Sequence, residues 1–268
     1  MTAPASAAAA SSAPAAVPAL ETRRLSKAFR GLVAVNGVDF RLEPGARHAL
    51  IGPNGAGKTT LVNLITGHLP AGGGSLFLHG ADITRLPEHR RIKRGLARTF
   101  QINQLFRRLT VLENVLAAVA ERTGAARDAW RPLAGHSALL DEAYAVLQAV
   151  ELHPDALKAV HELPYGRQRV LEIAIALALR PRVLLLDEPA AGVPAAESRH
   201  VLDVVASLTG DIAVLIIEHD MRVVFRFARR VTVMMNGSIL REGTPEEIAA
   251  DAQVRAVYLG ESGDGHAR

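Results

Sequence analysis

The chain has 268 residues, a formal net charge of +4 at pH 7, 49% hydrophobic and 22% charged residues, and no cysteine. This length and composition are typical of a globular protein with a sizeable core. The lack of cysteine excludes a disulfide framework and a thiolate metal site, and it fits a reducing compartment. No run of about 18 apolar residues is present, so we expect no transmembrane helix. Because the basic residues are scattered, we expect a solvated basic surface and no nucleic-acid partner.

The first segment, residues 1–20, consists almost entirely of Ala, Pro and Ser. It has too little bulky apolar surface to offset the entropy lost on ordering. It also lacks the basic start of a secretory signal. We therefore expect a disordered leader.

From residue 20 onward, strand-like and helix-like segments alternate. Residues 47–52, 182–187 and 212–217 are short apolar runs that predict buried strands, and residues 58–66 predict a helix. This alternation favours an α/β fold with a mainly parallel sheet and helices on both of its faces.

Two other segments depart from this alternation. Asn236-Gly237 lies between two apolar runs and predicts a β-hairpin, because both residues accept the positive φ of a type I′ turn. The segment of about residues 102–165 contains apolar side chains at three- and four-residue spacing, so we expect an inserted α-helical subdomain there. The surrounding domain is expected to span residues 21–255, and residues 256–268 are expected to be a short tail.

The first candidate site is a glycine-rich loop between a predicted strand and a predicted helix. It matches the pattern G-x-x-x-x-G-K-[ST] and consists of Gly52, Pro53, Asn54, Gly55, Ala56, Gly57, Lys58 and Thr59, followed by Thr60. Such a loop turns several backbone amides toward a phosphate at a helix N-terminus. We expect Lys58 to contact the β- and γ-phosphates of ATP and the Thr59 hydroxyl to bind Mg²⁺.

The second candidate site is the acidic pair Asp187-Glu188 at the end of a buried apolar run. Ligands of open α/β sheets bind at the carboxyl ends of the strands. We expect the Asp187 carboxylate to join the Mg²⁺ coordination and Glu188 to polarise the attacking water as the catalytic base.

Three further residues are candidates for the site because of their order in the chain relative to these two motifs. Gln101, at the entrance to the helical insert, is a candidate for contacting Mg²⁺ or water. His219 ends another buried strand and is a candidate for contacting the γ-phosphate. Phe29 is a candidate for stacking on adenine.

In this order the motifs resemble the ATP-binding cassette (ABC) family over about residues 20–260. Within that family the chain is similar to the ATPase subunits of branched-chain amino-acid importers. The similarity is carried by short segments, namely residues 31–35 (GLVAV), 80–84 (GADIT), 95–101 (GLARTFQ), 110–115 (TVLENV) and 258–261 (YLGE).

The resemblance implies a fold, a set of partners and a location. The fold is a P-loop NTPase (RecA-like) core with an antiparallel β subdomain and an inserted α-helical subdomain. The partners are a second ABC ATPase subunit, two transmembrane permease subunits and, indirectly, a periplasmic binding protein. The location is the cytoplasmic face of the inner membrane, with the chain bound peripherally. The activity is ATP hydrolysis coupled to solute transport.

The chain departs from the family pattern at the signature segment, which is presented to the partner's ATP. The usual Leu-Ser-Gly-Gly-Gln is replaced here by Leu163, Pro164, Tyr165, Gly166, Arg167 and Gln168. Pro194 also stands where the family has Asp or Asn. Because only the half of the site offered to a partner is altered, we favour a heterodimer. A homodimer remains open, since the Gly166 amide and the helix dipole can suffice without the serine.

Other functions within and beyond transport remain open. Urea or short-chain amide importers and lipopolysaccharide exporters have similar ATPases. An ABC ATPase outside transport is a further alternative, although the spacing of about sixty residues between Gln101 and Leu163 disfavours the repair members, which carry a long coiled coil there.

Overall fold

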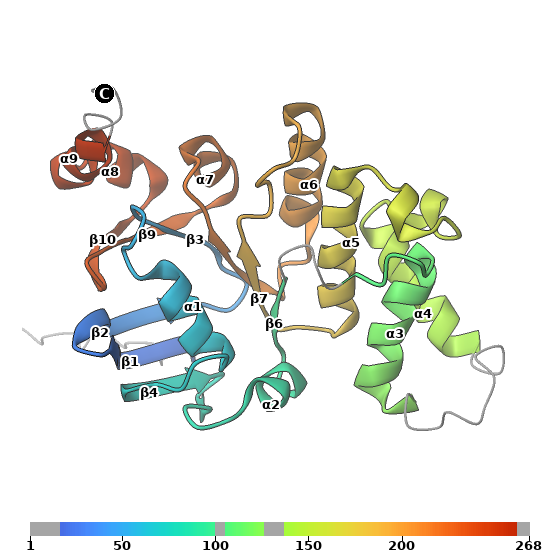
Figure 1. The fold of residues 1–268 in the computed structure, drawn as a ribbon, viewed down its shortest axis with the longest axis horizontal. Helices are drawn as coiled ribbons and strands as arrows, with labels where there is room; N and C mark the ends of the chain where they lie inside the picture. Colours follow the sequence, from blue (N-terminus) through green and yellow to red (C-terminus); the bar gives the residue numbers. More distant parts are fainter. Residues whose placement is uncertain (1–16, 100–104, 126–136, 262–268) are drawn as a thin grey trace, which may run out of the picture.

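The structure, a computed structural model, describes residues 17–99, 105–125 and 137–261. Its central feature is a six-stranded sheet with the strand order β10-β9-β3-β8-β7-β6, in which all neighbours are parallel except β10 and β9 (Figure 1). The strands are β3 (Arg47–Ile51), β6 (Leu96–Arg98), β7 (Val183–Asp187), β8 (Ala213–Ile217), β9 (Arg230–Met235) and β10 (Ser238–Gly243). The predicted α/β fold with a mainly parallel sheet is confirmed.

The hairpin of β9 and β10 turns at Asn236 and Gly237, as predicted from the dipeptide. Their φ angles are 49° and 78°, and positive φ at both central residues is the requirement of a type I′ turn. The turn lies close to the glycine-rich loop, because the Gly237 amide donates to the Ala56 carbonyl oxygen at 3.0 Å.

A second, antiparallel sheet has the order β2-β1-β4-β5 and lies beside the first (Figure 1). Its strands are β1 (Leu20–Phe29), β2 (Leu32–Leu42), β4 (Gly73–Leu78) and β5 (Ala81–Asp82). Helix α1 (Lys58–Thr66) packs between the two sheets. One buried cluster joins these parts, because Leu61, Leu64 and Ile65 of α1 share it with side chains of both sheets.

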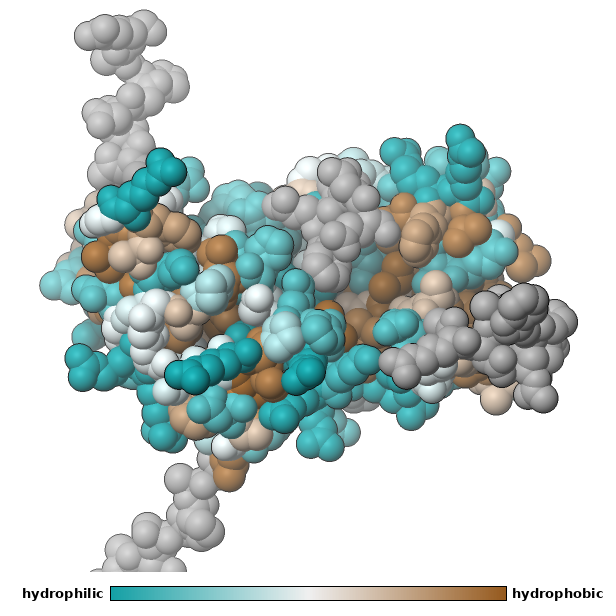
Figure 2. All heavy atoms as spheres, turned by 60° about the horizontal axis from the view of Figure 1, so that its bottom comes forward, coloured by the Kyte–Doolittle hydropathy of each residue, from teal (hydrophilic) through white to brown (hydrophobic). Residues whose placement is uncertain are grey.

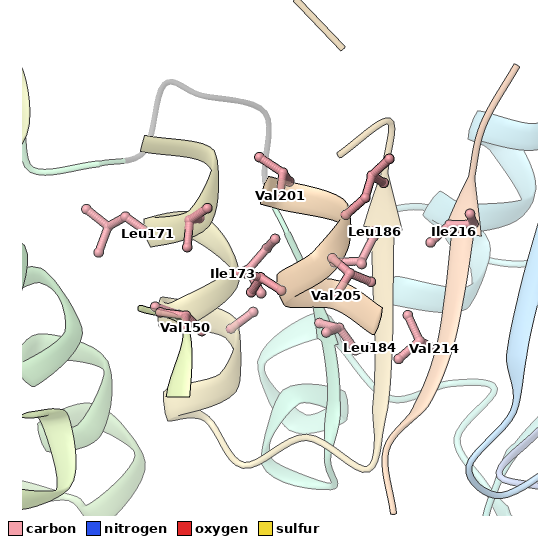
Figure 3. Close-up of a cluster of buried hydrophobic side chains, with 14 of the residues drawn as sticks. Val150, Leu171, Ile173, Leu184, Leu186, Val201, Val205, Val214 and Ile216 are labelled. Carbon is pink, nitrogen blue, oxygen red and sulfur yellow. The ribbon is translucent and has the colours of Figure 1, made fainter. Parts of the chain in front are cut away.

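The other face of the parallel sheet is covered by α5 (Tyr165–Ala178), α6 (Ala195–Ser207) and α7 (Met221–Phe227). Figure 3 shows Ile173, Val201 and Val205 on these helices packed against the buried side chains of β7 and β8. Both strands are apolar at nearly every position because helices or the second sheet cover both faces. This two-sided burial fixes where each strand ends, and with it the position of the residues that follow.

The range expected to form the helical subdomain contains α3 (Val111–Thr123), α4 (Ser137–Ala149) and the 3-10 turns η3 (His153–Asp155) and η4 (Val160–Glu162). Helix α3 begins at a capping box in which Thr110 and Glu113 satisfy each other's backbone amides. The helix ends before Gly124, which has a φ of 78°. The helices were predicted, and their division from the core as a separate subdomain stays a prediction.

Described elements extend past the predicted boundaries at both ends, and the division of the chain into domains stays a prediction. Ala19 and Leu20 are fully buried, and Leu20 pairs with Leu42 and Leu78 at the start of β1, so two residues of the expected leader belong to the packed core. At the other end, α8 (Pro245–Ala250) is followed by α9 (Ala252–Glu261), which runs through the expected boundary at residue 255. One further helix, α2 (Glu88–Lys93), precedes β6 in the chain.

No helix in the described ranges is long and apolar enough to cross a membrane. Polar side chains cover much of the face shown in Figure 2, and apolar side chains appear between them in separate groups. The exposed large apolar residues include Leu32, Phe106 and Leu157.

We expect Leu184→Ala to lower the free energy of unfolding by about 2–5 kcal/mol, because this β7 side chain is fully buried and its loss leaves a cavity. Urea denaturation measures the change. Leu157→Ala is the matched control, since Leu157 is 82% exposed and we expect a change within about 0.5 kcal/mol. Equal losses in the two variants would contradict the packing described for β7.

Candidate functional site

The glycine-rich loop of residues 52–57 connects β3 to α1 at the carboxyl edge of the parallel sheet. Gly55 and Gly57 have φ angles of 77° and 98°, which residues with a Cβ rarely adopt. A Cβ at Gly57 would also overlap the carbonyl oxygen of Ala34 on β2. Glycine is therefore required at position 57 by conformation and by space, and the loop lies tightly against β2.

A cavity of about 400 Å³ opens at this loop. It is lined by loop and helix residues 54–60, by the carboxylates of Asp187 and Glu188, by residues 32–34 of β2, and by the hairpin turn at 236–237. The two sequence motifs, which lie more than a hundred residues apart, thus meet in one cavity. No sequence pattern indicated the part of the lining that comes from β2 and the hairpin.

The Lys58 ammonium lies against the start of the glycine-rich loop. It donates to the carbonyl oxygens of Gly52 at 2.5 Å and Pro53 at 2.9 Å. This places a positive charge beside the first amides of α1, where the helix dipole also favours an anion. The arrangement can bind a polyphosphate.

Asp187 ends β7, and its carboxylate is largely buried in an ion pair. Its Oδ2 accepts from Nη2 of Arg98 at 2.6 Å. Thr59 and Asp187 both line the cavity, and a hydroxyl and a carboxylate are hard oxygen donors of the kind that suits Mg²⁺. The chemistry of the residues therefore fits a magnesium ion.

Glu188 and His219 come together next to Asp187. Glu188 Oε1 lies 3.3 Å from Nδ1 of His219, although the two residues follow different strands. The backbone of Glu188 has a φ of 45°, a strained value for a residue with a side chain, and its amide donates to the Ile217 carbonyl at 2.9 Å. The carboxylate is held at the cavity, where it can accept a proton from water.

Glu218 is a buried carboxyl group beside this pair that the sequence analysis missed. Burial raises the pKa of Glu218 to about 7, and the charge of Glu188 contributes to this rise. The backbone amide and the imidazole of His219 oppose this rise in pKa. Its Oε1 is buried without a hydrogen-bond partner among the described residues. The run of apolar residues before Glu218 indicates burial, but only the fold shows which charges surround it.

Of the predicted residues for the chain's own nucleotide that the structure describes, four do not line the cavity: Phe29, Gly52, Pro53 and His219. Phe29 is 41% exposed at the end of β1, and the Lys27 ammonium lies 5.4 Å from the centre of its ring. Leu32 and Val33 line the cavity where Phe29 does not. Gln101 lies outside the described residues. The adenine contact of Phe29 and the metal contact of Gln101 stay predictions.

The segment expected to serve as the signature forms the start of α5. Pro164 is the N-cap and the helix begins at Tyr165, so the proline does not prevent the helix. The Gly166 amide donates to Oε2 of Glu197 on α6 at 2.8 Å. Arg167 pairs with Asp155, and the Gln168 side chain donates to the Leu163 carbonyl at 2.8 Å.

None of the residues 163–168 lines the cavity at the glycine-rich loop. The start of α5 is therefore separate from the site that holds Lys58 and Asp187. Glu197, which accepts from the Gly166 amide, was not predicted, because a single Glu in the first turn of a helix carries no distinguishing pattern.

Replacing Glu218 with Gln should make stability less dependent on pH. The pKa of Glu218 is near 4.5 in an unfolded chain and about 7 in the fold, so the folded state binds more protons between these values. The contribution of Glu218 is complete below pH 4.5 and is lost as pH rises through 7. Unfolding free energies measured at pH 5 and pH 8 should show a wild-type loss of up to about 3 kcal/mol that Glu218→Gln lacks.

Glu246→Gln, on the surface of α8, is the matched control for this measurement. If Glu218→Gln and Glu246→Gln change with pH in the same way, Glu218 does not titrate as described.

Comparison with known proteins agrees with this geometry. The ABC transporter family model matches residues 35–191, and the model for branched-chain amino acid ATP-binding cassette transporters matches residues 242–264. Among solved structures, the ADP conformation of an ATP-binding cassette of an ABC transporter superposes on this chain with a TM-score of 0.81 and 31% sequence identity. The match covers 91% of this chain and 99% of that one.

Curated relatives cover the chain to a similar extent. BraF of Pseudomonas aeruginosa, a high-affinity branched-chain amino acid transport ATP-binding protein, is 38% identical over 91% of this chain and 99% of its own length. LivG of Escherichia coli, with the same description, is 38% identical over the same shares. LptB of Acidithiobacillus ferridurans, a lipopolysaccharide export system ATP-binding protein, is 35% identical over 90% of this chain and 97% of its own length. The chain therefore belongs to the ATP-binding proteins of the ABC transporter family.

Proposed function

We propose that this chain binds and hydrolyses ATP to drive a membrane importer for branched-chain amino acids. The observation that carries the proposal is the meeting of Glu188 and His219 at 3.3 Å beside the cavity of the glycine-rich loop. A site that only bound nucleotide, without hydrolysing it, would not need the Glu188 carboxylate and the His219 imidazole in contact beside the loop.

In this proposal the triphosphate lies along the amides of residues 52–59, and Lys58 contacts the β- and γ-phosphates. Binding of phosphate would draw the ammonium away from the Gly52 and Pro53 carbonyls, to which it now donates. Charge-assisted hydrogen bonds to phosphate are stronger than those to neutral carbonyls. Thr59, Asp187 and Gln101 are the proposed ligands of Mg²⁺, which would neutralise charge on the β- and γ-phosphates when bound.

Glu188 is the proposed catalytic base. Its carboxylate accepts a proton from a water molecule as the water oxygen attacks the γ-phosphorus and the bond to the β–γ bridging oxygen breaks. In this proposal His219 orients Glu188, which lies 3.3 Å from its Nδ1, and donates to a γ-phosphate oxygen. The strained backbone of Glu188 is consistent with a position fixed for chemistry.

The substrate class rests on the relatives. BraF and LivG are named for branched-chain amino acid transport, and the C-terminal residues 242–264 match the corresponding family model. A lipopolysaccharide exporter or a urea or short-chain amide importer is the alternative, and the similarity to LptB supports the first of these. The transported solute would contact the permease and the binding protein, so no residue of this chain is assigned to it.

The proposed assembly has two permease subunits at the cytoplasmic face of the inner membrane, a periplasmic binding protein and a second ATPase subunit. We favour a different chain as that second subunit. The chain retains the groups for its own ATP, whereas Pro164 replaces the signature serine and Glu197 holds the Gly166 amide. The partner's triphosphate would need to displace this carboxylate.

Glu188→Gln should abolish ATP turnover while leaving ATP binding intact, because the amide cannot accept the proton but preserves the shape of the site. Phosphate release and ATP binding are measured on the same protein. The control is Glu246→Gln, on the surface of α8, which should hydrolyse ATP at the wild-type rate. Unchanged hydrolysis by Glu188→Gln would refute the assigned base.

Deleting the gene should abolish uptake of labelled leucine, isoleucine and valine, and the wild-type gene should restore it, whereas Glu188→Gln should not. Normal uptake of all three, with impaired uptake of urea or with a defect in lipopolysaccharide export, would support the alternatives instead.

The purified chain alone should hydrolyse ATP slowly, and adding the second ATPase subunit should accelerate turnover. The expectation follows from the altered signature at Pro164. Brisk and cooperative hydrolysis by the isolated homodimer would contradict the proposed heterodimer.

A further inference from the structure

Arg98 forms an unusual bridge at the carboxyl edge of the parallel sheet. It is the last residue of β6, and its guanidinium contacts two elements of the candidate site. Nη2 donates to Oδ2 of Asp187 at 2.6 Å, and Nη1 donates to Oδ1 of Asn63 on α1 at 2.7 Å. Only 17% of the Arg98 side chain and 13% of the Asp187 side chain are exposed.

The two contacts connect the elements that carry the proposed metal ligands. Asn63 lies four residues after Thr59 on α1, so both project from the same side of that helix. Asp187 is the last residue of β7, which pairs directly with β6. One planar side chain thus joins the helix that carries the Thr59 hydroxyl to the strand that carries the Asp187 carboxylate.

We propose that Arg98 is a positioning residue for magnesium: its guanidinium bridge sets the separation of Thr59 and Asp187 and the orientation of the Asp187 carboxylate. This inference rests on the proposed Mg²⁺–ATP site. Arg98 binds Oδ2 and leaves Oδ1 for the metal, and this hydrogen bond restrains the rotation of the Asp187 carboxylate. Hydrogen-bonding partners behind metal ligands commonly affect metal affinity about 10- to 100-fold.

A purely structural ion pair is the alternative role for Arg98. Such a pair would stabilise the fold but would not distinguish ATP binding with magnesium from ATP binding without it. A lysine at position 98 separates the two roles. It keeps the positive charge, but its single ammonium cannot reach Oδ1 of Asn63 and Oδ2 of Asp187 in the geometry of the planar guanidinium.

The test measures ATP binding to the full chain by titration calorimetry, in chelator and over a series of Mg²⁺ concentrations. Arg98→Lys should raise the Mg²⁺ concentration needed for half of the magnesium-dependent gain in ATP affinity by about tenfold. Its ATP affinity in chelator should stay within about twofold of the wild type. Arg94→Lys, the same change at an exposed position after α2, is the matched control and should behave as the wild type.

Asn63→Ala is a second and independent test. It removes the hydrogen bond between Arg98 and Asn63, and it keeps the charge of Arg98 and the Arg98–Asp187 ion pair. It should cause a smaller shift in the same direction, and it decides the outcome if Arg98→Lys lowers the melting temperature. A magnesium requirement unchanged in both variants, or an equal loss of ATP binding with and without magnesium, would overturn the proposal. A wild-type chain that binds no ATP under either condition would instead refute the proposed function.

Discussion

The candidate site depends on the parallel pairing of β3, β8 and β7. Leu50 pairs with Ile217, and Ile217 pairs with Asp187, so three positions from distant parts of the sequence lie in one line across the sheet. The glycine-rich loop, His219 and Glu188 all follow this line within two residues. A shift of one residue in either pairing would turn the terminal side chains to the opposite face and separate these groups.

Packing on both faces holds this register. The second sheet and α1 bury one face, and α5, α6 and α7 bury the other. The strands are short, so their own hydrogen bonds are few, and the buried side chains on either side determine their position. Arg98 adds a polar contact between α1 and β7 at the same edge. The apolar packing and this bridge therefore act on the same geometry.

The sequence predicted the parts of this arrangement that local patterns specify. The glycine-rich loop, α1 from Lys58 to Thr66 and the Asn236-Gly237 turn carry strong local signals, and the structure confirms all three. The sequence did not predict the Arg98–Asp187 pair or the Gly166–Glu197 contact. These contacts join residues 89 and 31 positions apart, and a single Arg or Glu has no periodicity that marks its partner. The sequence also did not indicate the burial of Ala19 and Leu20, because burial depends on strands and helices elsewhere in the chain.

Lys58 tests the central claim, that the loop of amides and this ammonium together bind triphosphate. ATP binding to Lys58→Ala, measured by titration calorimetry with magnesium and compared with the exposed variant Lys93→Ala, is the most direct measurement. The expected result is an ATP affinity at least about tenfold weaker for Lys58→Ala, because charge-assisted hydrogen bonds contribute about 1.5–3 kcal/mol, with wild-type affinity for Lys93→Ala. A Lys58→Ala protein that folds and binds ATP as tightly as the wild type would contradict the claim.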